Sequence, residues 1–175
     1  PRAMIMIGRG LLILLAALWV ASPAADAGVR VYDRVTAVGY AVFLEVETRR
    51  FGFAEGGTRV RLYLDDRALG EILTGADGRG YLKYTPRAAG ELRLAARWRD
   101  FQGSGRLLVL KPDEKVVVVE IDAALRSHPL DQRLREGGAA ALETLSRRFR
   151  LIYLESPLGA LTNERWLTDS GLPQA

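Results

Sequence analysis

From residue 29 to about residue 111, apolar and polar side chains alternate along the chain, and turn residues interrupt the alternation about every ten positions. Successive side chains of a strand point to opposite faces, so this pattern lets one face of each strand be buried while the other meets water. It is typical of an antiparallel β-sandwich. The pattern predicts strands at 29–35, 41–48, 58–64, 68–74, 80–85, 92–97 and 106–110.

Short acidic and glycine-rich segments separate these predicted strands. Asp65-Asp66 is predicted to close one hairpin and residues 76–78 (Ala-Asp-Gly) another, because Asp and Gly supply the short polar side chain and the positive φ that such turns require. The aspartate pair is therefore interpreted as a turn and not as a metal site. The glycines within residues 75–80 lie between two strands and open no helix, which excludes a nucleotide-binding loop.

These turn residues also form a longer string between Leu69 and Gly90, whose centre reads TGADGRGY at residues 74–81. The string resembles the bacterial immunoglobulin-like modules, and the resemblance covers most of residues 30–111. It implies an immunoglobulin-like sandwich that serves as a spacer or as a surface for adhesion or for sugars. A fold by itself does not determine a function, so the resemblance leaves the ligand open.

The pattern changes after a short polar break at residues 111–114. Residues 116–119 are consecutive valines, which predicts a strand buried on both faces of a parallel sheet. A second apolar strand is predicted at 151–154, followed by a short helix that begins at Thr162. Between the strands, one face of a predicted helix carries Leu134, Gly138, Ala141, Leu142, Leu145 and Phe149. The fold class is therefore mixed: an antiparallel sandwich followed by a partial α/β unit of βαβα order.

Residues 117–125 (VVVEIDAAL) resemble the first motif of the haloacid-dehalogenase superfamily, and residues 138–173 are similar to its phosphatidate-phosphatase and lipin-like branch. The resemblance implies a Mg²⁺-dependent phosphatase, in which a first Asp attacks phosphorus and a second Asp acts as general acid and base. On this chain the nucleophile position is Glu120, the acid/base position is Asp122, and Ser156 comes one residue after the phosphate-binding position. Glu120 and Asp122 are also the candidate metal ligands.

The sequence departs from that family at the positions that carry the chemistry. Glu120 is one methylene longer than the aspartate that the in-line geometry requires, and Glu155 places a negative charge where phosphate would bind. The carboxylates of Glu120 and Asp122 are also too few for a cation that takes about six oxygen ligands. We therefore expect a degenerate, non-catalytic domain that needs no cofactor. The alternative is a Mg²⁺-dependent phosphatase, if the chain is a fragment of a longer protein.

The strongest apolar run is LLILLAALWV, at residues 11–20. Arg9 precedes it and Ala25-Asp26-Ala27 follows, which predicts a cleavable signal peptide at residues 1–27. An uncleaved anchor is the alternative, although a spanning helix needs about 20 apolar residues. The predicted domains are then this signal peptide, an immunoglobulin-like sandwich at 28–112 and a partial haloacid-dehalogenase-like domain at 113–175, in an exported protein that is periplasmic or secreted.

Composition and charge exclude several kinds of catalytic site and make one class of partner unexpected. The chain has no cysteine, which excludes disulfides, thiolate chemistry and cysteine-type zinc sites. Its single histidine, His128, has no partner in a recognisable hydrolase triad. The formal net charge of +4 comes from arginines scattered along the strands, so nucleic acid is not an expected partner. The expected role is binding or structural, with a protein, a glycan or a lipid phosphate as the partner and membrane contact only through an uncleaved signal.

Overall fold

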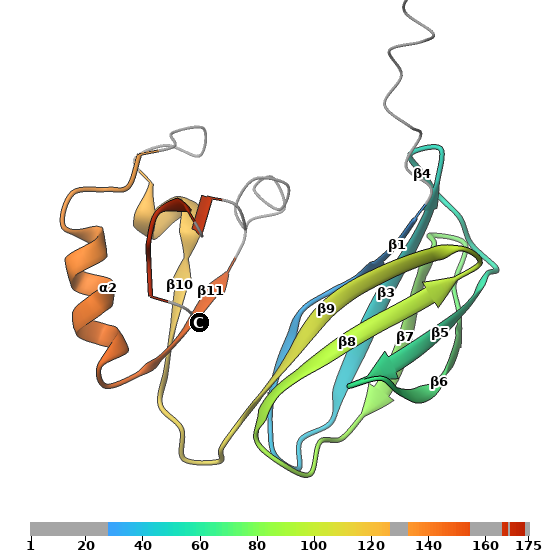
Figure 1. Cartoon of the computed structure of the whole chain (residues 1–175), viewed down its shortest axis with the longest axis horizontal. Coiled ribbons are helices and arrows are strands. Elements are labelled where there is room, and N and C mark those ends of the chain that lie inside the picture. Colours follow the sequence, from blue (N-terminus) through green and yellow to red (C-terminus); the bar gives the residue numbers. More distant parts are fainter. Residues whose placement is uncertain (1–27, 127–132, 155–165, 168, 174–175) are drawn as a thin grey trace, which may run out of the picture. The chain divides into compact units, whose positions relative to one another are not determined.

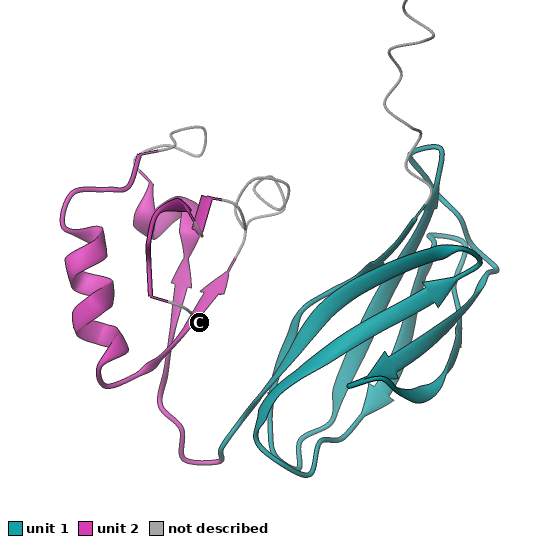
Figure 2. Ribbon diagram, in the orientation of Figure 1, with its two compact units in different colours: residues 1–111 teal, residues 112–175 magenta. Residues whose placement is uncertain are grey.

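The computed structural model describes residues 28–126, 133–154, 166–167 and 169–173; the predicted signal peptide, Ser156 and Thr162 lie outside these residues. The chain divides into two compact units, which meet in the sequence between Lys111 and Pro112 (Figure 2). Each unit has a hydrophobic core of its own.

The first unit consists of two β-sheets that share one hydrophobic core (Figure 1). The first sheet contains β1 (Gly28–Val31), β3 (Val42–Arg50), β4 (Phe53–Ala54) and β7 (Arg79–Tyr84), with β3 paired to the other three. The second sheet has the order β2 (Arg34–Ala37), β9 (Phe101–Leu110), β8 (Gly90–Trp98), β5 (Arg59–Leu64) and β6 (Arg67–Leu73). The predicted β-sandwich is therefore confirmed.

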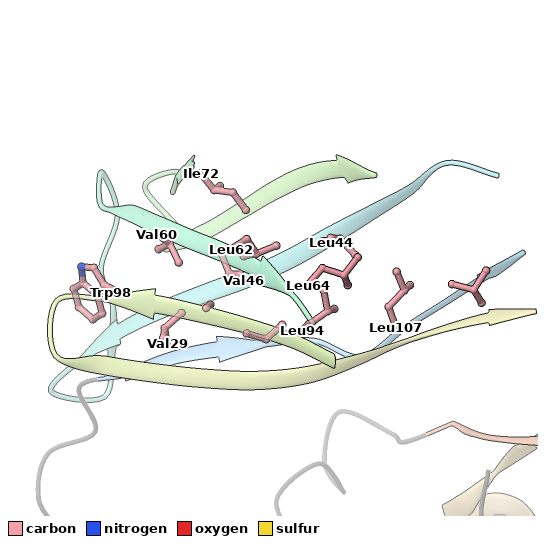
Figure 3. Packing of buried hydrophobic residues seen from close by; sticks show 13 residues of the cluster. Val29, Leu44, Val46, Val60, Leu62, Leu64, Ile72, Leu94, Trp98 and Leu107 are labelled. Carbon is pink, nitrogen blue, oxygen red and sulfur yellow. The ribbon is translucent and has the colours of Figure 1, made fainter. Parts of the chain in front are cut away.

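The core of the sandwich is built from the alternating apolar positions of the sequence (Figure 3). Val60, Leu62 and Leu64 of β5 are buried, whereas Arg61 between them is exposed. Because each strand contributes every second residue, side chains of both sheets meet in the same layer; the other buried members come from β1, β3, β6, β8 and β9. Burying one such Leu or Val side chain contributes about 1.5–3 kcal/mol, so this layer is the main source of the unit's stability.

The N-terminal edge differs from the single strand predicted at 29–35. The strand breaks at Tyr32 and Asp33: β1 runs antiparallel to β3 in the first sheet, while β2 runs parallel to β9 in the second. Asp33 stabilises the passage of the chain from the first sheet to the second, because its Oδ1 accepts a hydrogen bond from the backbone N–H of Arg106 in β9 at 2.7 Å. The prediction of one antiparallel strand is wrong because the alternation of apolar residues does not show which sheet a segment joins.

The two predicted hairpin turns have different outcomes. Asp65 and Asp66 close a two-residue hairpin between β5 and β6, with the positive φ angles (45° and 67°) that a type I′ turn requires. Residues 76–78 also form a turn, but it joins β6 of the second sheet to β7 of the first, so the predicted hairpin is wrong. Gly80 permits this crossing, since an ideal Cβ on it would lie 2.4 Å from Cγ2 of Ile72.

The strand β9 begins earlier than predicted. It starts at Phe101 instead of residue 106, after a tight turn at Arg99, whose φ is 52°. The first part of β9 was not predicted because it contains Gly103 and Gly105, and glycine is unfavourable in strand interiors. The two-residue strand β4 is likewise absent from the predicted set.

The second unit is built on two parallel strands with a helical connection. β10 (Val116–Glu120) pairs with β11 (Arg150–Leu154), and between them lie a helical turn, η1 (Ile121–Leu125), and the helix α2 (Gly138–Ser146). The helix begins at Gly138, whereas the predicted apolar face of the helix began at Leu134. Leu134 belongs instead to an isolated antiparallel bridge, and Gly137 has a left-handed φ of 76°. Leu142 of the predicted face is buried in the core of this unit.

Among the described residues of the second unit, the core lies against one face of this small sheet. Val117 and Val119 face the core, whereas Val118 is 58% exposed on the opposite face. Burial of residues 116–119 on both faces is therefore a wrong prediction: α2 and Trp166 pack on the same side. A run of β-branched residues has the same appearance whether one face or both are covered. In the described part of the chain, no helix has the length and apolar character needed to cross a membrane.

Candidate functional site

Glu120 and Asp122, two of the predicted catalytic residues, lie at the carboxyl end of β10, the kind of sheet edge where α/β proteins bind their ligands. Glu120 ends the strand, and Asp122 lies in η1. Oε2 of Glu120 accepts a hydrogen bond from the backbone N–H of Ala123 at 3.1 Å. Glu120 thereby caps the helical turn, whose first N–H groups have no partner within the turn.

Asp122 is engaged in a buried ion pair. Its Oδ1 lies 3.1 Å from Nη1 of Arg126, and the side chains of Asp122 and Arg126 are only 9% and 1% exposed. The guanidinium of Arg126 also stacks over Trp166, with its Cζ 4.3 Å from the ring centroid. Asp122 therefore compensates a charge that is buried in the core of the second unit, and removal of one partner from such a pair is strongly destabilising.

The two carboxylates that the structure describes at this strand end, those of Glu120 and Asp122, are not arranged as ligands of one Mg²⁺ ion. Magnesium requires near-octahedral oxygen ligation, in which one or two carboxylates point at the metal. Here Glu120 points to a backbone N–H and Asp122 to a guanidinium. Within the described ranges, no group of three or more His, Cys, Asp or Glu side chains is arranged to hold a metal. Ser156, the third predicted catalytic residue, lies outside those ranges.

A second cluster lies on the outer face of the first sheet. Glu45 and Glu47 alternate with the core residues Leu44 and Val46 on β3, so their side chains point away from the core. They are nevertheless only 7% and 4% exposed. The residues that surround them are Arg30, Tyr32, Arg34, Arg49 and Arg79, and we call the two glutamates and these five residues the Arg–Glu network.

Glu45 is held by two arginines, one from β2 and one from β7. Arg34 binds its Oε2, and Nη1 of Arg79 lies 3.1 Å from its Oε1. Arg34 also donates through Nε to the backbone carbonyl of Phe43, at 3.2 Å. Both oxygens of Glu45 are therefore engaged, while each guanidinium, which has five N–H donors, retains some of them for a further partner.

Glu47 is held by Tyr32 and Arg49. The Tyr32 hydroxyl donates to Oε2, and Nε of Arg49 lies 2.8 Å from Oε1. Burial by itself raises the pKa of Glu47, but the hydrogen bonds from Tyr32 and Arg49 outweigh burial and hold the pKa below its usual value. The pKa of Tyr32 is raised, first by burial and then by its bond to the Glu47 carboxylate. At neutral pH the two residues therefore form a carboxylate and a protonated phenol.

Three guanidinium groups surround the ring of Tyr32. Their Cζ atoms lie 4.9 Å (Arg30), 5.8 Å (Arg34) and 5.8 Å (Arg79) from the ring centroid, within the range of cation–π contacts. The side chains of Arg34 and Arg79 stay 32% and 44% exposed. Since every oxygen of the two glutamates is engaged, the network is suited to present fixed hydrogen-bond donors and not to transfer a proton or hold a metal.

The Arg–Glu network was not predicted from the sequence. Its clearest signal was the position of Glu45 and Glu47 on the polar face of a predicted strand, but glutamates in such positions are ordinarily solvated. Their burial depends on partners that are distant in the sequence, since Tyr32 is 15 positions from Glu47 and Arg79 is 34 positions from Glu45. Only the pairing of β3 with its neighbours brings these residues together.

No protein-family model matches the sequence, and no curated protein matches it. The chain is similar to the IG27 protein domain, with 16% identity, a TM-score of 0.39 and coverage of 47% of this chain and 92% of that one. A CARDB domain from Pyrococcus furiosus, solved in complex with di-metal ions, is 17% identical, with a TM-score of 0.36 and coverage of 50% and 97%. The D00–D0 domain of intimin is 12% identical, with a TM-score of 0.41 and coverage of 51% and 50%.

Proposed function

We propose that this chain is an exported, non-catalytic binding protein, composed of an immunoglobulin-like β-sandwich and a degenerate domain of the haloacid-dehalogenase type. The buried pair of Asp122 and Arg126 is the observation that carries the proposal. In the phosphatase mechanism, the residue at the Asp122 position must reach the leaving group and exchange a proton with it. A carboxylate turned into the core against a guanidinium acts instead as a structural group.

The position of Glu120 supports the same conclusion. Its carboxylate caps η1 through Ala123 and would have to leave this contact to attack phosphorus. A glutamate also extends one methylene further than the aspartate of the resembled family, in a reaction that tolerates little displacement of the attacking oxygen. Both carboxylates therefore have structural partners, and we assign the binding role to the sandwich.

The outer face of the first sheet supports a binding role. The Arg–Glu network fixes several guanidinium groups on a sheet, and the rings of Phe43 and Tyr81 are exposed on the same face. Arginine and aromatic side chains are enriched at interaction surfaces, because they combine a large contact area with directional hydrogen bonds. A rigid sheet also positions such groups more accurately than a loop does.

Export is proposed from the sequence of residues 1–27, where a basic residue, an apolar run and a small-x-small site follow one another. After expression in a bacterial host, we expect the mature chain to begin at Gly28. Intact-mass measurement checks this, because a mass that retains residues 1–27 indicates the membrane-anchored alternative.

A phosphatase assay tests the non-catalytic role. The full chain is incubated with excess Mg²⁺ and, in separate reactions, an aryl phosphate and a phosphatidate. We expect no phosphate release above the blank, for the wild-type chain and for Asp122→Asn alike. Mg²⁺-dependent turnover that disappears in Asp122→Asn, while circular dichroism shows both proteins folded, would overturn the proposal in favour of a Mg²⁺-dependent phosphatase.

A further inference from the structure

Three neighbouring strands of the first sheet bring their outward side chains into rows. The pairing of β1, β3 and β7 places Arg30 and Arg79 on either side of Glu47. In the next row along β3, Tyr81 of β7 lies beside Glu45. Charged and aromatic residues therefore alternate along this face of the sheet.

The face continues beyond the Arg–Glu network to Phe43 and Lys83, which are cross-strand partners on β3 and β7. Phe43 is 59% exposed, and Tyr81, next to Lys83 in the alternation of β7, is 52% exposed. Both rings point away from the core, because they alternate with core-facing residues of their own strands. The apolar surfaces of these rings are thus available to a ligand that has apolar surface of its own.

The charge of the face favours an anionic ligand. Five cationic side chains accompany the two glutamates here: Arg30, Arg34, Arg49, Arg79 and Lys83. The glutamates are buried beneath the arginines, and their oxygens are engaged. A ligand therefore meets guanidinium N–H groups, which bind carboxylates with bidentate geometry.

An acidic polysaccharide matches this combination of groups. Its carboxylates suit the guanidinium forks, its hydroxyls suit the remaining polar groups, and the C–H face of a sugar ring packs on an exposed aromatic ring. A nucleic acid matches less well, because nucleic-acid sites gather Lys and Arg to neutralise phosphates. Here Arg34 and Arg79 already share the charge of Glu45.

We propose that the outer face of the first sheet binds an acidic polysaccharide. The proposal rests on the proposed role of the chain as a non-catalytic binding protein and names the class of its ligand. The Arg–Glu network takes the uronate carboxylates, and Phe43 and Tyr81 take the sugar rings. Because the buried glutamates hold the arginines in place before a ligand arrives, binding costs little side-chain entropy.

Isothermal titration of the full chain with oligogalacturonates at physiological salt tests this proposal. A neutral dextran of similar length and a single-stranded oligonucleotide are the comparison ligands. We expect binding of the oligogalacturonate, which weakens as salt is raised, and little binding of the other two. Phe43→Ala and Lys83→Gln should each weaken binding by about three- to tenfold. Phe51→Ala, which removes an exposed ring in the turn after β3, should leave the affinity unchanged.

Several results would overturn the polysaccharide proposal. No binding of oligogalacturonate excludes the ligand class, and equal binding of the oligonucleotide indicates a general polyanion surface. Equal binding of dextran would show that charge does not determine the affinity. Wild-type affinity in both Phe43→Ala and Lys83→Gln would show that the ligand binds at another surface. These outcomes do not affect the phosphatase assay, which concerns Asp122 in the other unit, so failure of the ligand class and failure of the non-catalytic role are separate results.

Discussion

An ideal Cβ on Gly103 would lie 2.0 Å from the carbonyl oxygen of Val29, a separation that no side chain tolerates. Val29 belongs to β1 of the first sheet and Gly103 to β9 of the second. The backbones of the two sheets therefore approach each other here with no side chain between them. The glycine is required by this close approach and not by its φ angle.

Substitution of Gly103 by alanine should destabilise the sandwich, because the added methyl group forces the two backbones apart. Overpacking of this kind costs about 1–3 kcal/mol. Urea unfolding followed by tryptophan fluorescence measures the loss, since Trp98 is buried in the same core. Gly28→Ala is the matched control, because an ideal Cβ at that position meets nothing within 4 Å. Equal midpoints for the two variants would contradict the close approach.

Asp122→Ala should destabilise the second unit by about 3–5 kcal/mol, because it removes one partner of a buried ion pair. Thermal unfolding measured by circular dichroism checks this, and Asp113→Ala, at an exposed position in the same unit, is the control. Asp122→Asn, which keeps an acceptor at this position, should fall between wild type and Asp122→Ala. If Asp122→Ala unfolds like the control, the ion pair has no structural role.

The free energy of unfolding of the sandwich should decrease at acidic pH, because the Glu47 carboxylate becomes protonated. The folded-state pKa of this residue is below its unfolded value of about 4.3, so its contribution is fully present above that pH and is lost as the pH falls through the folded pKa. Urea unfolding between neutral pH and about pH 3 measures the change. In Glu47→Gln the corresponding part of the pH dependence should be absent, whereas Glu91→Gln, at an exposed position of β8, should keep the wild-type profile.

Tyr32→Phe should destabilise the sandwich by about 1–3 kcal/mol, because Glu47 loses one of its two hydrogen-bond donors while it stays buried. Tyr40→Phe, which removes a hydroxyl from an exposed ring, should have little effect. Denaturant midpoints at neutral pH compare the two variants. A loss in Tyr40→Phe as large as that in Tyr32→Phe would show that the bond to Glu47 is not the cause.

The strands of the sandwich could be predicted where the determining interactions are local. Val60 and Leu62 are buried as predicted, because their alternation with Arg61 decides which face of β5 turns inward. The Asp65-Asp66 hairpin was predictable for the same reason, since the preference for positive φ belongs to the turn residues themselves. The switch at Asp33 was not, because the sheet that each segment joins depends on partners far along the chain.

In the candidate sites, too, the features that depend on distant segments of the chain could not be predicted. Asp122 was singled out through the resemblance of residues 117–125 to a known motif, but its ion-pair partner Arg126, four residues later, was not predicted. Burial of that pair under Trp166 could not be predicted, because it depends on how a distant segment packs. The Arg–Glu network was missed since its burial arises from strand pairing, which no single strand encodes.

The pairing of β2 with β9 has a mechanical consequence. These strands run parallel through four residue pairs, from Arg34↔Leu107 to Ala37↔Leu110, and β9 leads directly toward the second unit. The hydrogen bonds of a parallel pair are evenly spaced. A force that pulls on the N-terminal side of β2 and on the C-terminal end of β9 acts on these bonds in shear, so that they resist together instead of opening one after another. Pulling these two strands apart along their length should therefore require more force than peeling one of them from the sheet.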